Sequence, residues 1–341
     1  MHPTIEVVAP ARLHFGLWSL GLPPKAGQGA RQFGGVGVMI RRPAVRLRIE
    51  PTRGWTVQGE QSERALAFAQ CWAAYHGCSL PDCRLTLEEV PPPHAGLGSG
   101  TQLALSVAAG LSLFCGKPIP TLSELAESVG RGRRSAVGTY GFAFGGLIVE
   151  RGKAPHERIS PLEYRVVLPS AWHFVLVRPL GVQGLAGSQE AEALARLPPV
   201  PPRVTQELVE RVRQEMVPAA LRGDFATFSE SVYAYGHRAG TCFAPLQGGP
   251  YNGSVVTALV ERLRHMGIRG VGQSSWGPTV YALAASRPEA EALAEQLARC
   301  RDLPPLEVLV TETAPRGAAL APQAIWEAVL TGSDGARSER G

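Results

Sequence analysis

The sequence predicts an α+β protein with a ferredoxin-like layer in its C-terminal part. Two observations carry this prediction. Short stretches of apolar and polar alternation, typical of half-buried strands, are interspersed with longer stretches in which apolar residues recur at helical spacing. Near the C-terminal end these patterns follow one another as helix, strand, helix and strand, which is typical of helices layered on a sheet. The length of 341 residues allows two domains or one large one.

The N-terminal part opens on a short apolar strand, followed by a glycine-rich loop over 16–37. A helix is predicted over 62–76, because apolar residues recur there at helical spacing and Gly77 is a favourable C-cap. A second helix begins near Ser99, and a third covers 122–130. Strands, the last of them entered through glycines, are expected at 5–9, 44–50, 84–90 and 141–150.

The C-terminal part contains a proline-rich segment, 197–203, which excludes regular helix and central strand. We interpret it as an internal connection, because helical patterns resume directly after it. The expected helices cover 205–222, 224–235, 254–266 and 288–301. The expected strands cover 281–285 and 306–312.

Composition and charge exclude several functional classes. The chain has 34 basic and 29 acidic residues, and no basic run carries interleaved aromatic residues, which argues against nucleic-acid binding. Only three of the basic residues are lysines, so arginine, which binds phosphate and carboxylate in a forked geometry, dominates the positive charge. The longest apolar stretch, 103–114, is too short to span a bilayer, and the N-terminus lacks the apolar core of a signal peptide.

The six cysteines form no C-x-x-C pair and fit buried free thiols in a reducing compartment. A zinc site at Cys71, Cys78 and Cys83 is the alternative, although their spacing matches no common ligand pattern. We therefore expect a cytoplasmic protein that binds neither nucleic acid nor a membrane.

The strongest chemical signal is the run GLGSGT at 96–101, which opens a long apolar helix. Small residues let a ligand approach the backbone, and the unpaired N–H groups and dipole of a helix start attract an anion such as phosphate. The run is neither a Walker loop, since no lysine follows it, nor a dinucleotide fingerprint. The alternative is a tight turn before a packed helix, with Ser99 as N-cap. The candidate phosphate-binding residues are Gly96, Gly98, Ser99, Gly100 and Thr101.

Two further segments carry candidate site residues. Arg12 and His14 follow the first strand at a two-residue spacing, which places both on one face if the strand continues; otherwise they are a surface arginine and a structural histidine. The segment GQSSWGP at 272–278 offers glycines, hydroxyls and an amide between a helix and a strand, or forms an ordinary turn. The segment QGGPY at 247–251 by itself predicts only a turn.

Taken in chain order, PARLHFG, PPPHAGLGSGT and GQSSWGP resemble the three motifs of the GHMP kinase superfamily, which includes galactokinase, homoserine kinase and mevalonate kinase. The resemblance extends over about residues 4–315. It implies a two-lobed α+β fold, with a ribosomal-protein-S5-like N-terminal lobe that carries the phosphate loop and a ferredoxin-like C-terminal lobe. We expect these lobes at 1–165 and 166–330, with a frayed tail at 331–341.

Within this superfamily, ARLHFGL, FGGVGVMI, GLGSGTQLAL and GQSSWGPTVYAL are similar to the β-ribofuranosylaminobenzene 5′-phosphate synthases, a non-kinase branch in methanopterin biosynthesis. The last stretch discriminates best, because the kinases usually have a G-x-G-x-G-G-like run there. The resemblance implies that phosphoribosyl pyrophosphate condenses with 4-aminobenzoate or 4-hydroxybenzoate while CO₂ and pyrophosphate leave. It also implies Mg²⁺, no organic cofactor and a homodimer; the sequence does not distinguish the two aromatic acids.

An ATP-dependent small-molecule kinase of the same superfamily is the alternative function. Several of these kinases carry an aspartate in a Ser-Gly-x-Asp stretch, which is taken to activate the acceptor hydroxyl. Here the stretch reads SAVG at 135–138, so Gly138 occupies the aspartate position. A kinase that depends on this base is therefore disfavoured.

The implied chemistry assigns candidate roles. The departing pyrophosphate requires cations and N–H donors, and the aromatic carboxylate requires an arginine. Arg12 and His14 are the first candidates for catalysis, because they lie inside a motif and histidine titrates near neutrality. Further substrate-binding candidates are Arg134, Ser135, Gln273, Ser274, Ser275 and Trp276. Secondary candidates are Arg31 and Arg133 for the carboxylate, Phe15, Phe33 and Tyr140 for the walls, and His237 as a second proton carrier.

Overall fold

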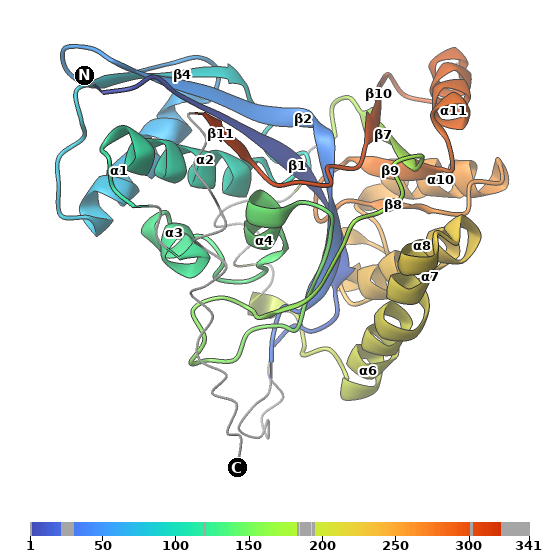
Figure 1. Cartoon of the computed structure of the whole chain (residues 1–341). Coiled ribbons are helices and arrows are strands. Elements are labelled where there is room, and N and C mark those ends of the chain that lie inside the picture. The colour runs from blue at the N-terminus through green and yellow to red at the C-terminus, as the bar shows by residue number, and fades with distance from the viewer. Residues whose placement is uncertain are drawn as a thin grey trace.

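The computed structural model describes residues 2–21, 31–118, 121–182, 184, 192, 195–300 and 303–321, which form two lobes (Figure 1). The predicted tail at 331–341 lies outside the described residues. Within the described part of the chain, every helix is too short or too polar to cross a membrane.

The N-terminal lobe is a largely antiparallel sheet with helices packed on one face (Figure 1). Its strands are β1 (Ile5–Leu17), β2 (Gly35–Pro51), β3 (Thr56–Gln58), β4 (Cys83–Glu89), β5 (Leu147–Glu150), β6 (Leu162–Val166) and β11 (Ala319–Ala321). Its helices are α1 (Ser62–Tyr75), α2 (Ser99–Phe114), α3 (Leu122–Ser128) and α4 (Val137–Phe144). The order along the sheet is β11-β1-β2-β4-β3, and β2 is long enough to pair with β5 beyond β4.

Helix α2 is buried along almost its whole length, because its residues are apolar or small on every side. It packs against β1 and β2 on one side and α1 on the other. Trp72 of α1 donates its indole N–H to the Ser112 hydroxyl of α2 at 3.0 Å, which satisfies two polar groups in the middle of this core. This bond fixes the C-terminal end of α2 against α1.

The C-terminal lobe confirms the predicted ferredoxin-like arrangement. Its four-stranded antiparallel sheet has the order β10-β7-β9-β8. The strands are β7 (His173–Pro179), β8 (Val271–Gln273), β9 (Val280–Ala284) and β10 (Leu306–Glu312). The helices are α6 (Pro202–Arg211), α7 (Val217–Arg222), α8 (Phe225–Thr241), α9 (Ala244–Gln247), α10 (Gly253–His265) and α11 (Arg287–Arg299), with a π-helical turn at 212–216 between α6 and α7.

Both faces of this second sheet are buried. Phe174 and Leu176 of β7 face α6, α7 and α8, whereas Val175 and Val177 face α10 and α11. The strands are therefore apolar at successive positions, which explains why their sequences show apolar runs in place of alternation.

Several sequence-based predictions differ from the structure. The proline-rich segment 197–203, expected to exclude helix, ends inside α6, because proline is tolerated in the first turn of a helix. The segment expected as a strand over 141–150 is helix α4 followed by β5, and the glycines let α4 approach the sheet: a Cβ at Gly141 would lie 2.1 Å from the Met39 sulfur. The loop expected over 16–37 is shorter at both ends, because β1 reaches Leu17 and β2 starts at Gly35. The domain expected over 166–330 ends earlier, because β11 pairs with β1 of the first lobe.

The cysteines also differ from the expectation of buried thiols. Cys83 is buried, but Cys71 and Cys78 are exposed, and all six are free. Cys71 lies on the outward face of α1, which explains its exposure.

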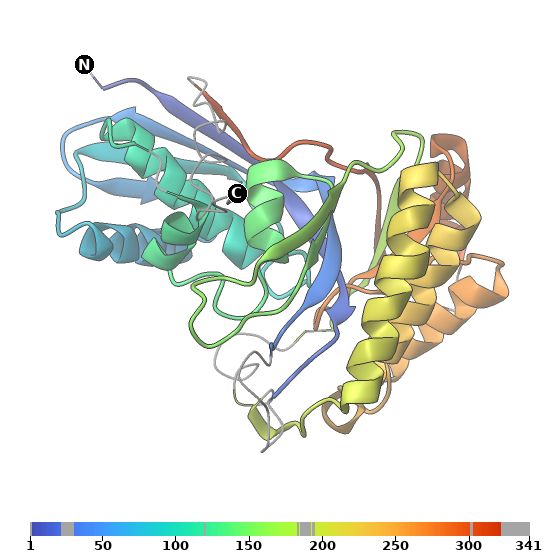
Figure 2. The same cartoon turned by 60° about the horizontal axis from the view of Figure 1, so that its bottom comes forward.

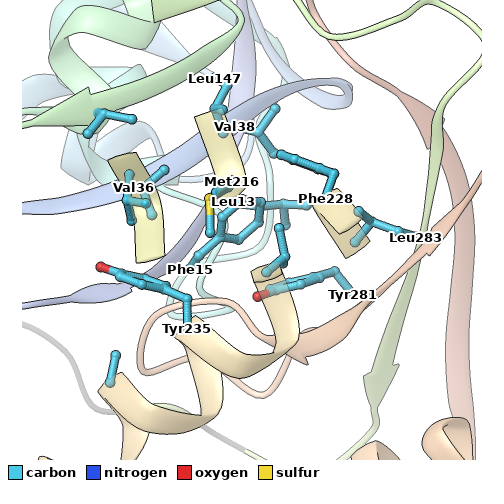
Figure 3. Close-up of a cluster of buried hydrophobic side chains, with 14 of the residues drawn as sticks. Leu13, Phe15, Val36, Val38, Leu147, Met216, Phe228, Tyr235, Tyr281 and Leu283 are labelled. Carbon is cyan, nitrogen blue, oxygen red and sulfur yellow. The ribbon is translucent and has the colours of Figure 1, made fainter. Parts of the chain in front are cut away.

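A single hydrophobic core joins the two lobes (Figure 3). Phe15 of β1 packs against Tyr281 of β9 with ring centroids 5.1 Å apart. Tyr235 of α8 is fully buried and donates its hydroxyl to the Gly16 carbonyl at 2.8 Å. The carboxyl end of β1 is therefore fixed between α8 and the second sheet. Figure 2 shows the helices of the second lobe beside the strands of the first sheet.

The close approach of β1 and β2 predicts a strong effect of Gly37→Ala. A Cβ at Gly37 would lie 2.3 Å from the Leu13 carbonyl oxygen and 2.9 Å from Val137, so the two strands must separate next to His14. We expect a loss of about 1–3 kcal/mol in the free energy of unfolding, measured by urea denaturation.

Gly138→Ala, on α4, is the matched control. Its Cβ would make an ordinary 3.4 Å contact with Thr101, and alanine favours a helix. This variant should be as stable as the wild type or more so; equal losses in both variants would contradict the steric argument.

Candidate active site

A cavity of about 280 Å³ opens where the end of β1, the start of α2 and helix α8 meet the loop that joins β8 to β9. Residues from the two lobes line it together. The lining residues are Arg12, His14, Phe15, Gly16, Leu17, Thr101, Gly130, Arg131, Gly132, Arg133, Arg134, Ser135, Gly236, Gly240, Phe243, Gln247, Pro250, Tyr251, Gln273, Ser275 and Trp276.

Arg12 and His14 reach the cavity because β1 continues through them, as the conditional prediction required. The pairing of β1 with β2 shifts between His14 and Gly16, which marks a β-bulge. At this bulge the Gly16 N–H donates to Nδ1 of His14 at 3.2 Å. The bulge thus both bends the strand at the cavity and fixes one ring nitrogen of His14.

The start of α2 concentrates positive charge. The ideal Cβ position at Gly98 lies 3.2 Å from Arg12, and that at Gly100 lies 2.9 Å from Arg64 and 3.6 Å from Arg131. Three guanidinium groups therefore surround the first turn of a helix whose own N–H groups carry partial positive charge. No acidic residue stands in that turn. This arrangement favours a bound anion such as phosphate.

The three motif segments contact one another through the loop between β8 and β9. The Ser274 hydroxyl accepts the backbone N–H of His14 at 3.0 Å and donates to the Gly96 carbonyl at 2.7 Å. The Ser275 N–H donates to the His14 carbonyl at 3.0 Å, with Ser275 in the left-handed region at φ 56°. Because the loops are this close, a side chain at Gly96 would lie 2.1 Å from the Ser274 carbonyl oxygen.

The cavity is lined by both cationic and aromatic side chains. Arg12 and the segment after α3 supply four arginines, and none of the described residues that line the cavity is acidic. Phe15, Phe243, Tyr251 and Trp276 supply aromatic rings, with Phe243 and Trp276 edge to face at 4.8 Å between centroids. The site therefore suits a ligand that combines anionic groups with an apolar ring.

A buried carboxyl group lies directly behind the cavity. Glu150, at the end of β5, is fully buried and accepts the Ser135 hydroxyl at 2.6 Å and the Ala136 N–H at 2.7 Å. Ser135 in turn lies 3.1 Å from Nε2 of His14. Burial raises the pKa of Glu150 to about 7, although the hydrogen bonds from Ser135 and Ala136 act in the opposite direction.

His14 is uncharged in this environment. Burial first, and then the neighbouring charge of Arg12, hold the pKa of His14 well below its usual value. Both ring nitrogens have partners within the protein, since Nδ1 accepts from Gly16 and Nε2 faces Ser135.

The predicted site residues fall into two groups. Those that line the cavity are Arg12, His14, Thr101, Arg134, Ser135, Gln273, Ser275 and Trp276, together with the secondary candidates Phe15 and Arg133. Those that support it from behind are Gly96, Gly98, Ser99, Gly100 and Ser274. Their catalytic and binding roles stay predictions.

Four secondary candidates lie elsewhere among the described residues. Arg31 forms an ion pair with Glu157, and the ring of Tyr140 stacks with that of Phe144. Phe33 packs against the interlobe core, and His237 contacts the ring of Tyr251 from outside the cavity lining.

The sequence analysis missed several lining residues. Arg131 belongs to the run GRGRRS at 130–135, whose density of arginine and glycine was an available signal. Gln247 and Tyr251 lie in the segment that predicted only a turn, and nothing in their local pattern indicates that α8 carries them to the cavity. Glu150 was missed because it ends an apolar strand with no motif around it.

The residues present do not form a protein cage for Mg²⁺. Among the described residues, no group of three His, Cys, Asp or Glu side chains is placed to hold a metal ion. The nearest carboxyl group, Glu150, is engaged by Ser135 and Ala136.

Comparison with known families agrees with this architecture. The model of the GHMP kinases N terminal domain matches residues 64–146, and that of the GHMP kinases C terminal domain matches residues 216–302. The homoserine kinase structure from Cytophaga hutchinsonii superposes with a TM-score of 0.65 at 14% identity, over 94% of this chain and 98% of that one. Mevalonate-3-kinase from Thermoplasma acidophilum gives 0.65 at 13% identity, over 95% and 100%. The chain therefore belongs to the GHMP kinase superfamily, and it is an enzyme of that superfamily.

The proteins that match this chain by sequence indicate a narrower group within the superfamily. The beta-ribofuranosylphenol 5'-phosphate synthase of Methanothermobacter thermautotrophicus is 28% identical over 307 residues, covering 83% of this chain and 90% of that protein. The synthase of the same name from Archaeoglobus fulgidus is 27% identical over 296 residues, covering 83% and 88%. Within the superfamily, the chain is a homologue of these synthases, which confirms the predicted resemblance.

Glu150 is expected to make the stability fall as the pH rises. Its pKa in the folded protein, about 7, lies above its ordinary value of 4.5, so the folded state binds this proton more tightly than the unfolded state. Relative to Glu150→Gln, the wild-type free energy of unfolding should decrease by about 3 kcal/mol from pH 4.5 to pH 7 and level off above. Urea unfolding of both proteins across this range measures the difference.

His14 acts in the opposite direction below pH 6.5, because its pKa is lowered, but it is present in both proteins. The comparison therefore isolates Glu150. A difference between the two proteins that does not change with pH would contradict the ionisation of a buried carboxyl group at this position.

Proposed function

We propose that this protein is a decarboxylating phosphoribosyl transferase that joins phosphoribosyl pyrophosphate to 4-hydroxybenzoate or 4-aminobenzoate. A C–C bond forms between C1 of the ribose and the ring carbon that bears the carboxylate, and CO₂ and pyrophosphate leave. The observation that carries the proposal is that arginines and aromatic rings line the same cavity. A phosphorylated sugar and an aromatic acid that react with each other need both kinds of group close together.

The arginines and the start of α2 account for the phosphate groups. Arg12, Arg131 and the start of α2 at Ser99 and Gly100 would stabilise the negative charge that increases as pyrophosphate leaves. Magnesium, which the family resemblance implies, would enter with the pyrophosphate and not on protein carboxylates; no step of the proposal depends on a protein-held ion. The product would serve methanopterin biosynthesis.

The aromatic wall accounts for the acceptor. Phe15, Phe243 and Trp276 provide an apolar slot for a benzoate ring, and their burial excludes water from the developing positive charge on the ribose. The relatives are named for a phenol product, which corresponds to 4-hydroxybenzoate as acceptor. We therefore propose testing this acid beside 4-aminobenzoate.

A kinase of the same superfamily is the second candidate, since the solved structures of similar fold include kinases. It is less well supported here, because Gly138 on α4 provides no carboxylate at the position of the kinase base. One fold hosts several chemistries, so the reaction itself must decide.

The test is release of labelled CO₂. Purified protein, Mg²⁺ and phosphoribosyl pyrophosphate are incubated with carboxyl-labelled 4-hydroxybenzoate or 4-aminobenzoate, with and without ATP. Label release that requires phosphoribosyl pyrophosphate but not ATP supports the synthase. ATP turnover with homoserine, mevalonate or galactose, and no label release, would replace it with the kinase.

Arg12 is expected to recognise an anion through its forked guanidinium group. Arg12→Ala should lower kcat/KM for label release by about 10–150-fold, which is the loss of about 1.5–3 kcal/mol for a charge-assisted contact. Arg12→Lys should be nearly as impaired, because lysine keeps the charge but not the fork.

The control is Arg178→Lys, which changes an arginine paired with Glu307 on the second sheet, away from the cavity. It should keep wild-type kinetics. If Arg12→Ala also keeps wild-type kinetics and melts normally, Arg12 does not contact the substrate.

A further inference from the structure

The strongest feature that the proposed function leaves unused is the chain of groups from Glu150 through Ser135 to His14. Glu150 has no exposed surface, whereas Ser135 and His14 both line the cavity. A carboxyl group is costly to bury, and this one lies at the end of β5, one hydroxyl away from the ligand space. Its position connects a proton acceptor in the protein interior to the cavity.

The hydrogen bonds between these three groups all run in one direction, from His14 through Ser135 to Glu150. The Gly16 N–H points at Nδ1 of His14, so Nδ1 is the acceptor and the neutral ring carries its proton on Nε2. Nε2–H then donates to the Ser135 oxygen at 3.1 Å. The Val137 N–H also donates to that oxygen, at 3.3 Å. With two donors on its oxygen, the Ser135 hydroxyl must direct its own hydrogen to Glu150 at 2.6 Å.

We propose that Ser135 is the proton-transfer group of the cavity and that Glu150 is the buried base behind it, taking up the proton that the 4-hydroxy or 4-amino group of the aromatic acid releases. His14 is the positioning residue that orients the Ser135 hydroxyl. This proposal rests on the proposed function for the identity of the substrate.

The step balances as follows. As the ring carbon bonds to C1 of the ribose, positive charge develops on the substituent opposite the carboxylate. That substituent gives its proton to the Ser135 oxygen, which loses its long hydrogen bond from the Val137 N–H. At the same time the Ser135 proton passes to Glu150. The electron pair of the broken O–H or N–H bond stays on the substituent. When CO₂ leaves, the electrons of its C–C bond restore the aromatic ring, and the proton returns by the same path. Glu150 ends the cycle ionised, as it began.

Glu150 is better suited to this task than His14. The imidazole of His14 is buried beside the positive charge of Arg12, and both the burial and this charge oppose protonation of the ring. The carboxylate is also desolvated, but uptake of a proton removes its charge. Proton transfer toward Glu150 therefore relieves a burial cost, whereas transfer to His14 would add one.

The kinetic test compares Glu150→Gln, Ser135→Ala and the double variant in label release. Each single variant should lower kcat by about 100–10,000-fold with little change in the KM for either substrate, and the double variant should be no worse than the singles. Should Glu150→Gln fail to fold, Ser135→Ala changes a half-buried position and serves alone. The control is Glu163→Gln. Glu163 lies on β6, and its largely buried carboxylate forms an ion pair with Arg213, so this variant should keep wild-type kinetics.

A substrate without the proton makes the test specific. With 4-methoxybenzoate or 4-(dimethylamino)benzoate there is no O–H or N–H to remove, so Glu150→Gln and the wild type should turn over at the same reduced rate. A Glu150→Gln defect that stays as large with these acids, or a loss of less than about 10-fold with the normal acid, would overturn the proposal.

A spectroscopic measurement separates this proposal from the function itself. In ¹⁵N spectra of the wild type at pH 8 without substrate, His14 should be the neutral tautomer with its proton on Nε2, assigned by loss of its signals in His14→Gln. A proton on Nδ1 would reverse the direction of the hydrogen bonds between His14, Ser135 and Glu150 and would overturn the proposal. Absence of label release from the wild type, with Nε2–H observed, would instead refute only the proposed reaction.

Discussion

The Ser274 hydroxyl is the contact on which the site depends. It accepts the N–H of His14 and donates to the carbonyl of Gly96, so one side chain from the second lobe joins the first strand and the glycine-rich loop before α2 in the first lobe. Glycine at 96 is required for the same reason, because a side chain there would meet the backbone of this loop. The cavity exists only while the two lobes stay in this contact, and the core around Phe15 and Tyr235 keeps them there.

Burial separates the acidic group of the site from its arginines. Arg12 and Arg131, beside the start of α2, line the cavity, where an anionic ligand can neutralise them, whereas the carboxyl group of Glu150 is withdrawn behind Ser135. This separation keeps the carboxyl group from forming an ion pair with the arginines that a bound anion would need. It also leaves Glu150 with a pKa of about 7, in the range where a group can both take up and release a proton near neutral pH.

The superfamily fold is shared with kinases, and in this chain the residues around the cavity include arginines and aromatic rings. Gly138 stands on α4 where several of the kinases have a carboxylate, and Glu150 approaches from the next strand instead. Phe243 and Tyr251, which follow α8 in the chain, line the cavity together with Phe15 and Trp276. The shared fold is thus combined with site residues that the proposed reaction would use, since one fold hosts several chemistries.

Local sequence determined the elements whose signals lie within a few residues. The glycine-rich start of α2 and the last helices and strands of the second lobe, α10, β9, α11 and β10, were predictable, because each depends on periodicity or on backbone freedom at a glycine. Strands β7 and β8 of the same sheet carried no prediction. Helix α4 was mistaken for a strand, since an apolar run with glycines has no period that separates the two. Tertiary structure alone decided that Arg131 and Tyr251 line the same cavity and that Glu150 lies behind it, bonded to Ser135. These residues are separated by long stretches of chain and belong to no common motif, and only the packing of α8 and the second sheet against β1 and β5 brings them together.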